Sequence, residues 1–372
     1  MKVLFIVQGE GRGHLTQAIA MEKILTRNGY EVVEILVGKS ESRRLPGFFT
    51  RNTNAQVRQF ISPNFLPTPS NKRASLSASV FHNIKKIPEF IDSMCFINRR
   101  IKESKADLVI NFYELLCGLT FCLFRPNVRN ICIGHQYLFL HKDFHFPKKN
   151  MFQAKLLNIF SYITSIGADQ RLALSFRRME DDSKKKIKVI PPLLRKEVFQ
   201  QKTSDGDYIH GYMVNSGFSD YIMEWHRKNP ETPLRFFWDK WEEDEIKKID
   251  ETLSFYHLDD EKFLNQMAGC KAYASTAGFE SVCEAMYLGK PIMMVPAHIE
   301  QECNAYDAMK SGAGITDNGF NLDRLLEFSK DFKPDIRFRS WVNAAEYIVM
   351  ENIEEAIGNH IISEMYMVEE FI

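Results

Sequence analysis

The sequence ASTAGFESVCEAMYLGKPIMMVPAHIEQECNA, residues 274–305, predicts the fold of the second half of the chain. It holds a short apolar strand, a turn around Gly278, a helix, a Gly-Lys-Pro stop and a second apolar strand. Apolar residues at helical spacing predict a helix from about Glu280 to Leu288, because Gly289 suits a helix C-terminus and Pro291 prevents continuation. This order of elements is typical of an α/β fold.

The N-terminus of this helix is predicted to bind phosphate. Gly278 lets the backbone approach a ligand closely, and the free N–H groups of the first turn lie at the positive end of the helix dipole. Ser281 adds a hydroxyl, and Glu284, one turn deeper, can accept two hydrogen bonds from a ribose diol. The polar loop after the second strand would supply groups for sugar hydroxyls. The segment therefore predicts a pocket for a nucleotide diphosphate.

These residues resemble the donor-binding signature of GT-B glycosyltransferases, both the UDP-glycosyltransferases and the peptidoglycan N-acetylglucosaminyltransferases. The pattern Gly-aromatic-x-Ser-x-x-Glu is matched by Gly278, Phe279, Ser281 and Glu284. The pattern Gly-x-Pro, then Pro, acid-Gln and Asn-Ala is matched by Gly289, Pro291, Pro296, Glu300, Gln301, Asn304 and Ala305. Two positions depart from the plant-type box: Thr276 replaces a phosphate-binding His, and Glu280 replaces Asn.

The N-terminal sequence predicts a βαβ unit that opens another doubly wound domain. Lys2–Val7 is a continuous apolar run, Gly9–His14 is a glycine-rich turn, and a helix ending at Asn28-Gly29 leads to a strand at Glu31–Val37. Further strands are predicted at 108–111, 130–133, 171–175, 188–190, 208–214, 234–238 and 254–256. Residues 49–81, rich in Asn, Pro and Ser, are predicted to form loops at an acceptor rim.

The predicted fold class is α/β, with two Rossmann-like doubly wound domains facing each other across a ligand-holding cleft. Residues 1–195 would form the acceptor-binding domain and residues 205–342 the nucleotide-sugar domain. The GT-B resemblance implies that the C-terminal helices, within 343–372, pack back on the first domain.

His14 is the candidate catalytic residue. Gly13-His14 matches a Gly-His pair that is frequent in the first loop of GT-B proteins. An imidazole titrates near neutral pH, so His14 could deprotonate an acceptor hydroxyl; the alternative is that it orients a phosphate or caps the turn. The motif is not the dinucleotide fingerprint GxGxxG, because its third Gly falls one position early and Glu34 lies in mid-strand, which disfavours an NAD enzyme.

The remaining site candidates follow strand ends or come from the resemblance. The predicted donor-binding residues are Gly11, Gly13, Asn215, Ser216, Gly217, His257, Leu258, Ala277, Gly278, Phe279, Ser281, Glu284, His298, Glu300 and Gln301. The predicted acceptor contacts are Glu114, His135 and Gln136. Each of these three could equally be a structural polar group.

No metal site is predicted. Asp205-Gly206-Asp207 spells the DxD motif of GT-A transferases, but it precedes a strand where that motif follows one. The absence of CxxC argues against structural zinc, and seven cysteines without paired spacing favour reduced thiols in the cytoplasm.

Charge and hydropathy exclude several other classes. Lys+Arg and Asp+Glu both number 48, so no overall field favours nucleic acid. The N-terminus is typical of a first strand and not of a signal peptide. The longest apolar stretch is too short to span a bilayer. The basic and apolar segment 43–49 could touch a membrane surface, although a solvated loop is the favoured interpretation.

The sequence thus predicts a cytoplasmic glycosyltransferase that uses a nucleotide-diphosphate sugar as co-substrate, with UDP favoured and no other cofactor. A peripheral position at the inner face of the membrane is an open alternative. Inversion at the anomeric carbon is implied by the resemblance alone. The loops expected to bind the acceptor, at about 40–105, carry no motif, so a lipid-linked acceptor and a glycan both stay open. The competing hypotheses are a UDP-sugar 2-epimerase and a non-catalytic nucleotide-sugar-binding protein.

Overall fold

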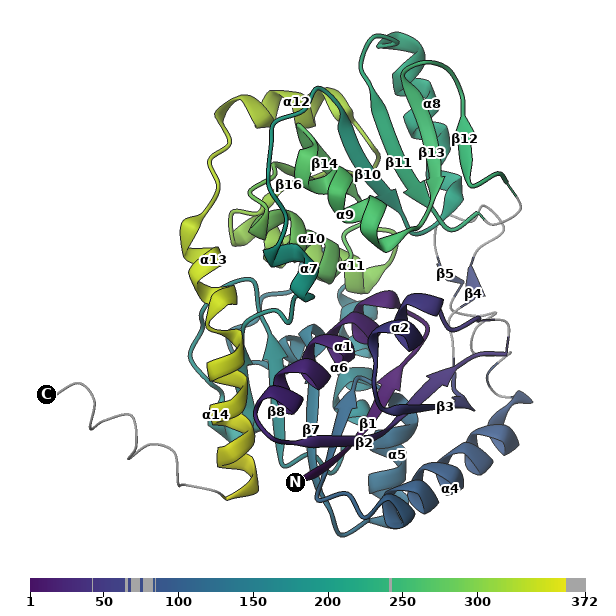
Figure 1. Cartoon of the computed structure of the whole chain (residues 1–372), viewed down its shortest axis with the longest axis vertical. Coiled ribbons are helices and arrows are strands. Elements are labelled where there is room, and N and C mark those ends of the chain that lie inside the picture. The colour runs from purple at the N-terminus through teal and green to yellow at the C-terminus, as the bar shows by residue number, and fades with distance from the viewer. Residues whose placement is uncertain are drawn as a thin grey trace, which may run out of the picture.

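The computed structural model describes residues 1–41, 43–63, 66–67, 74–75, 83, 85–240 and 243–358. Within these residues the chain forms two α/β halves, one above the other in Figure 1, and each half is built on a seven-stranded sheet. The two Rossmann-like domains expected from the sequence are confirmed.

The first sheet is parallel throughout, and β1 lies where its strand order reverses. In spatial order its strands are β3 (Gln56–Ile61), β2 (Glu31–Lys39), β1 (Lys2–Gln8), β6 (Leu108–Phe112), β7 (Arg129–Gly134), β8 (Gln170–Leu174) and β9 (Ile187–Ile190). At such a reversal, the carboxyl ends of the strands border a crevice that holds ligands in open α/β sheets. The glycine-rich turn after β1 therefore lies at this crevice.

The helices of the first half connect these strands. They are α1 (Arg12–Arg27), α2 (Gly47–Asn52), α4 (Ile87–Ser104), α5 (Leu115–Phe124) and α6 (Met151–Thr164), with short 3-10 turns η1 (His135–Leu140) and η2 (Ser183–Lys185). Helix α1 ends as predicted, with Asn28 as its C-cap and Gly29 at a φ of +78°.

The prediction that residues 49–81 form only loops is wrong. Phe48 and Phe49 are buried in α2, and β3 pairs with β2 at the edge of the sheet. Most of the side chains of β3 are exposed or half-buried, which explains why its sequence lacks an apolar run. Two short strands, β4 (Leu66–Pro67) and β5 (Ala74–Ser75), form an antiparallel pair, and the rest of 64–81 lies outside the described residues.

The burial of Phe48 and Phe49 also bears on the segment at 43–49. Its two aromatic side chains pack inward, and the Arg12 guanidinium lies 4.4 Å from the centre of the Phe48 ring. They are therefore not presented to a membrane surface. None of the helices in the described part of the chain is both long enough and apolar enough to cross a membrane.

The parallel strands of the second sheet repeat the order of the first six strands of the first sheet, and the antiparallel strand β12 is added at one edge. In spatial order its strands are β12 (Ile246–Lys248), β13 (Leu253–His257), β11 (Leu234–Trp238), β10 (Ile209–Met213), β14 (Ala272–Ser275), β15 (Ile292–Met294) and β16 (Gly314–Thr316). Its helices and 3-10 turn are η3 (Ser216–Phe218), α8 (Ser219–Lys228), α9 (Asp260–Gly269), α10 (Phe279–Tyr287), α11 (Ile299–Lys310) and α12 (Leu322–Asp331). The helix predicted at 280–288 is confirmed as α10, and Gly289 follows it at a φ of +70°.

Two segments connect the halves. The linker after β9 contains α7 (Lys196–Phe199), and the chain returns through α13 (Ile336–Asn343) and α14 (Ala345–Ile357). Helix α14 runs along the first half in Figure 1 and contacts β7 and β9. Its Glu355 carboxylate lies 2.8 Å from Lys188 Nζ. The predicted return of the C-terminal helix is therefore confirmed, and residues 359–372 lie outside the described part of the chain.

Candidate functional site

The turn between β14 and α10 forms one wall of the candidate site. Ala277 has a φ of +50°, a left-handed conformation that is uncommon for a residue with a side chain, and its carbonyl accepts a hydrogen bond from Asn304 Nδ2 at 3.5 Å. Gly278 itself has extended backbone angles, and a Cβ placed on it would meet only Ser281 Oγ, at 3.7 Å. The special backbone angle thus belongs to Ala277, while Gly278 leaves open space over the first turn of α10.

Thr276 joins this turn to the end of β10. Its Oγ1 accepts a hydrogen bond from the backbone N–H of Val214 at 3.0 Å, and its own N–H donates to the carbonyl of Tyr212 at 3.2 Å. Asn215, Ser216 and Gly217 follow Val214 directly, so the turn is held beside α10. No side chain caps the N-terminus of α10. Its first-turn N–H groups have the chemistry of an anion site.

His14 lies in the first turn of α1 and is 8% exposed. Its Nδ1 is 3.3 Å from Gln17 Oε1, its Nε2 is 3.3 Å from Gln136 Nε2, and its ring stacks on Tyr113 with 5.6 Å between centres. Burial lowers the pKa of His14 below its usual 6.5, although the charge of Glu300 and the Gln17 hydrogen bond raise it. The imidazole is therefore neutral at pH 7, as a general base must be.

Two hydrogen bonds join the surroundings of His14 to the second half. Gln136 Nε2 donates to Glu300 Oε1 at 2.8 Å, and Gln17 Nε2 donates to Glu280 Oε1 at 2.5 Å. The predicted residues His14, Gln136 and Glu300 are thus brought together across the two halves. Burial and the neighbouring Glu284 raise the pKa of Glu280 to about 8, against the hydrogen bond from Gln17 and the charge of Arg195.

Glu284 is buried and ion-paired. Arg195, in the linker before α7, donates from Nε to Glu284 Oε1 at 2.6 Å and from Nη2 to Oε2 at 3.2 Å. Its Nη1 lies 3.5 Å from Asp260, which also pairs with Arg12 at 2.6 Å. A ribose diol could bind Glu284 beside Arg195, or it could replace the hydrogen bonds that Arg195 donates to Glu284.

The other predicted acceptor residues have structural partners. His135 Nδ1 donates to the carbonyl of Leu174 at 2.7 Å, and its ring stacks on Phe279 with 4.1 Å between centres. Glu114 caps α5 through the N–H of Leu116 and accepts from Ser62 Oγ at 2.6 Å. Burial raises the pKa of Glu114 to about 7, although these hydrogen bonds lower it.

The remaining donor candidates lie in both halves: Gly11 and Gly13 at the start of α1, and the others at the edge of the second sheet. Gly13 approaches α10 so closely that a Cβ on it would lie 3.1 Å from Glu280 Cγ, whereas a Cβ on Gly11 would meet only Gln8. Gln301 Oε1 accepts from the N–H of Ala297 at 2.8 Å, and His298 is the N-cap of α11. His257 Nε2 lies 2.9 Å from the carbonyl of Lys240, and Leu258 is half-buried.

Several residues at this site were not predicted. Gln17 lies one helical turn after His14, so helical spacing could have placed the two side chains together. Glu280 was noted only as a departure from the plant-type box. Arg195 and Asp260 carry no local signal, because their contacts join segments far apart in the sequence.

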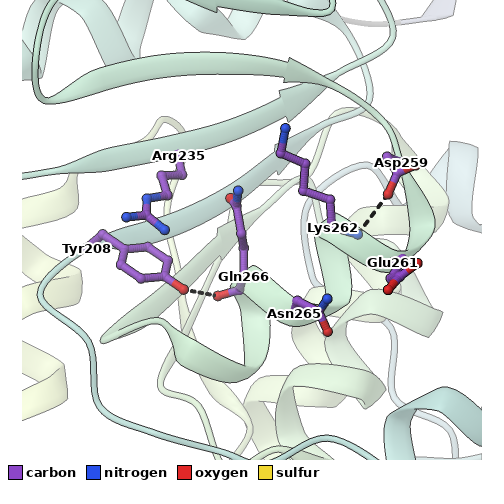
Figure 2. A pocket seen from close by; sticks show the side chains of 7 residues that line it. All are labelled: Tyr208, Arg235, Asp259, Glu261, Lys262, Asn265 and Gln266. Atoms are coloured by element: carbon purple, nitrogen blue, oxygen red, sulfur yellow. Dashed lines mark hydrogen bonds between the residues drawn. The ribbon is translucent and has the colours of Figure 1, made fainter.

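A hollow of about 500 Å³ lies elsewhere, along α9. Figure 2 shows its side chains, which are Tyr208, Arg235, Asp259, Glu261, Lys262, Asn265 and Gln266. The Arg235 guanidinium lies 3.8 Å from the centre of the Tyr208 ring, and the Tyr208 hydroxyl donates to the carbonyl of Gln266. None of the predicted site residues lines this hollow, so it is separate from the site between the halves.

Comparisons with known proteins identify the family and the fold. A family model described as glycosyl transferase family 1 matches residues 1–332. No curated protein matches the chain. Among solved structures, the glycotransferase of kitacinnamycin superposes with a TM-score of 0.63 at 13% identity, covering 95% of this chain and 98% of that one.

Two further solved structures are similar over nearly their whole length. Arabidopsis thaliana UGT89C1, complexed with UDP-L-rhamnose, has a TM-score of 0.56 and 14% identity, over 96% of this chain and 98% of its own. CalG4, the calicheamicin glycosyltransferase, has a TM-score of 0.58 and 12% identity, over 96% and 99%. The expected GT-B fold is confirmed.

The raised pKa of Glu280 predicts a pH-dependent stability. Its pKa is about 8 in the folded protein against a usual 4.5, so its contribution is fully present below pH 4.5 and is lost as pH rises through 8. We expect Glu280→Gln to gain stability relative to the natural chain as pH increases over this range, by up to about 1.4 kcal/mol per pH unit. Thermal unfolding from pH 5 to pH 9 measures the difference.

The matched control is Glu251→Gln, because the Glu251 side chain is 92% exposed. That variant should follow the natural chain at every pH. An equal stability difference for Glu280→Gln at pH 5 and pH 9 would contradict the prediction.

Proposed function

The chain belongs to glycosyl transferase family 1, and from that premise we propose that it moves a sugar from a nucleotide-diphosphate sugar to an acceptor hydroxyl. The observation that carries this proposal is the uncapped N-terminus of α10, which lies across the interface from His14. The structure of UGT89C1 with UDP-L-rhamnose supports a UDP-sugar as the donor.

The diphosphate would bind at the N-terminus of α10. Oriented N–H groups and the helix dipole stabilise the negative charge that grows on the diphosphate as the bond to the sugar breaks. Glu284 would hold the ribose, and Glu300 and Gln301 the sugar hydroxyls. Because the charge is stabilised by the helix, the reaction needs no metal. Asp205 of the DxD sequence supports this, since its side chain is 100% exposed in the linker.

His14 would act as the general base. Its neutral imidazole removes the proton from the acceptor hydroxyl while the acceptor oxygen attacks the anomeric carbon and the diphosphate leaves. A single displacement of this kind inverts the anomeric centre. His14 lies in a mostly buried interface, where the proton transfer is shielded from water.

A UDP-sugar 2-epimerase is the second candidate. Such an enzyme needs carboxylates in the cleft, and Glu280 and Glu300 approach His14 through Gln17 and Gln136. Release of free UDP from the donor in the absence of any acceptor would favour the epimerase, whereas UDP release that depends on an acceptor supports transfer.

We propose that the acceptor is lipid-linked and that α6 docks on an anionic membrane at its cytoplasmic face. The helix exposes large apolar side chains at helical spacing, with Phe152 74% and Ile159 54% exposed. Lys148, Lys149 and Lys155 are exposed beside them. Apolar side chains flanked by lysines are the composition that binds anionic lipid surfaces.

The first prediction from the proposed function concerns the donor. Hydrogen bonds to a charged group are worth about 1.5–3 kcal/mol, so Glu284→Gln should raise the KM for a UDP-sugar roughly 10- to 100-fold. Initial rates of the natural chain and the variant over a range of donor concentrations measure the KM. The rates of the natural chain should be the same with and without EDTA, because no metal is needed. Glu251→Gln is the control, and an unchanged KM for Glu284→Gln would refute its role.

The second prediction concerns the base. His14→Ala should lower kcat about 10²- to 10⁴-fold and leave the Kd for UDP nearly unchanged, because only proton removal is lost. In the natural chain, kcat/KM should decrease on acidification with a midpoint below pH 6.5, because the pKa of His14 is lowered. The control is His145→Ala, an exposed histidine. Full activity of His14→Ala would rule out the base.

The third prediction concerns the membrane. The chain should sediment with vesicles that contain phosphatidylserine and not with phosphatidylcholine alone, and Phe152→Ser/Ile159→Ser should abolish sedimentation. Ile336→Ser/Tyr347→Ser is the matched control, because those side chains are 75% and 66% exposed on α13 and α14. Binding that survives the α6 double variant would exclude α6 as the docking face.

A further inference from the structure

We infer that the second half of the chain fixes the tautomer of His14 through two glutamine amides. Glu280 acts through Gln17 and Glu300 acts through Gln136, so these four are positioning residues for the base. The inference rests on the proposed function of His14. It adds a reason why the histidine accepts a proton at one particular nitrogen.

The contact with Glu280 fixes one side of the ring. Gln17 Nε2 lies 2.5 Å from Glu280 Oε1. Above pH 8, where Glu280 is ionised, its carboxylate can only accept hydrogen bonds. The NH₂ group of Gln17 therefore faces Glu280, and its carbonyl oxygen faces His14 Nδ1 at 3.3 Å. Since that oxygen can only accept, Nδ1 carries the proton.

The contact with Glu300 fixes the other side independently. Gln136 Nε2 lies 2.8 Å from Glu300 Oε1 and 3.3 Å from His14 Nε2. An amide nitrogen has two N–H groups, one for each of these acceptors. The flipped amide would set its oxygen against the oxygen of Glu300, which cannot donate when ionised. His14 Nε2 is therefore unprotonated, in agreement with the first side.

Both constraints leave the lone pair of His14 on Nε2. When an acceptor hydroxyl replaces Gln136 at this nitrogen, Gln136 keeps its hydrogen bond to Glu300. The hydroxyl proton then moves to Nε2 as the oxygen forms its bond to the sugar, and the ring becomes an imidazolium. Gln17 Oε1 still accepts from Nδ1, and it does so with its amide held by Glu280. The other tautomer would present an N–H to the acceptor and could not take its proton.

The arrangement also couples the base to the donor half. His14, Gln17 and Gln136 belong to α1 and η1 of the first half, whereas Glu280 begins α10 and Glu300 begins α11. Both helices start at the carboxyl edge of the second sheet, where the donor is proposed to bind. The tautomer is therefore set only while the two halves are in contact.

The test reads the tautomer directly, without substrate. We would record ¹⁵N NMR spectra of the full chain with labelled histidine at pH 9, and assign the His14 signals by their loss in His14→Gln. At this pH Glu280 is ionised; the charged groups facing it are Glu284 and Arg195. We expect a protonated Nδ1 and an unprotonated Nε2. A protonated Nε2 in the natural chain would overturn the inference.

A pair of variants tests the role in turnover. Gln17→Met removes the acceptor for Nδ1–H, so both tautomers should appear and kcat should fall about three- to tenfold, the worth of one hydrogen bond, with the donor KM unchanged. Gln17→Glu/Glu280→Gln exchanges the amide and the carboxylate and keeps an acceptor at Nδ1. It should restore the single tautomer and most of kcat.

The outcomes separate the inference from the function on which it rests. If His14→Ala lowers kcat but Gln17→Met leaves the tautomer and kcat unchanged, the base stands and its positioning by Gln17 is refuted. If His14→Ala keeps full activity, the proposed base fails, whatever the tautomer. Equal losses in Gln17→Met and the exchanged variant would show a merely structural role and would also refute the positioning.

Discussion

Pairing of the carboxylates on α10 and α11 is the constraint on which the contact between the halves depends. A carboxylate removed from water is costly unless hydrogen-bond donors or a cation compensate it. Glu284 is compensated by Arg195 of the linker and Glu300 by Gln136. Glu280 accepts a hydrogen bond from Gln17, and burial raises its pKa to about 8, so it avoids the cost by keeping its proton at neutral pH. All of these donors come from outside the second sheet. Carboxylates at the proposed donor site thus also make the hydrogen bonds that connect the second half to the first half and the linker.

The sequence was sufficient to predict what local periodicity determines. The buried strands are continuous apolar runs, and the stop after α10 needs only Gly289 and Pro291, so both were found without the structure. The edge strand β3 was missed because an edge strand keeps polar side chains toward water and has no apolar run. The missed residue Arg195 has a different cause. Its partners Glu284 and Asp260 are distant in sequence, and no spacing rule joins them.

The turn before α10 has a backbone feature that the sequence does not reveal. Gly278 leaves open space for a close approach, as its lack of a side chain suggests, but the left-handed backbone angle belongs to its neighbour Ala277. That conformation costs free energy for a residue with a Cβ, so the surroundings must hold it. Asn304 supplies one hydrogen bond to the Ala277 carbonyl, and Thr276 fixes the preceding residue against β10. The Asn of the Asn-Ala pair is therefore a support for the turn.

The pairing of Glu284 also bears on the proposed binding of the donor. A ribose diol at the proposed Glu284 contact would bind beside Arg195 or exchange with one or both of its hydrogen bonds. The arginine would not be left without a partner, because Asp260 lies 3.5 Å from its Nη1. Asp260 is in turn held at 2.6 Å by Arg12, which lies two residues before His14. The proposed ribose contact and the start of the helix that carries His14 are therefore linked by one chain of ion pairs, from Glu284 through Arg195 and Asp260 to Arg12.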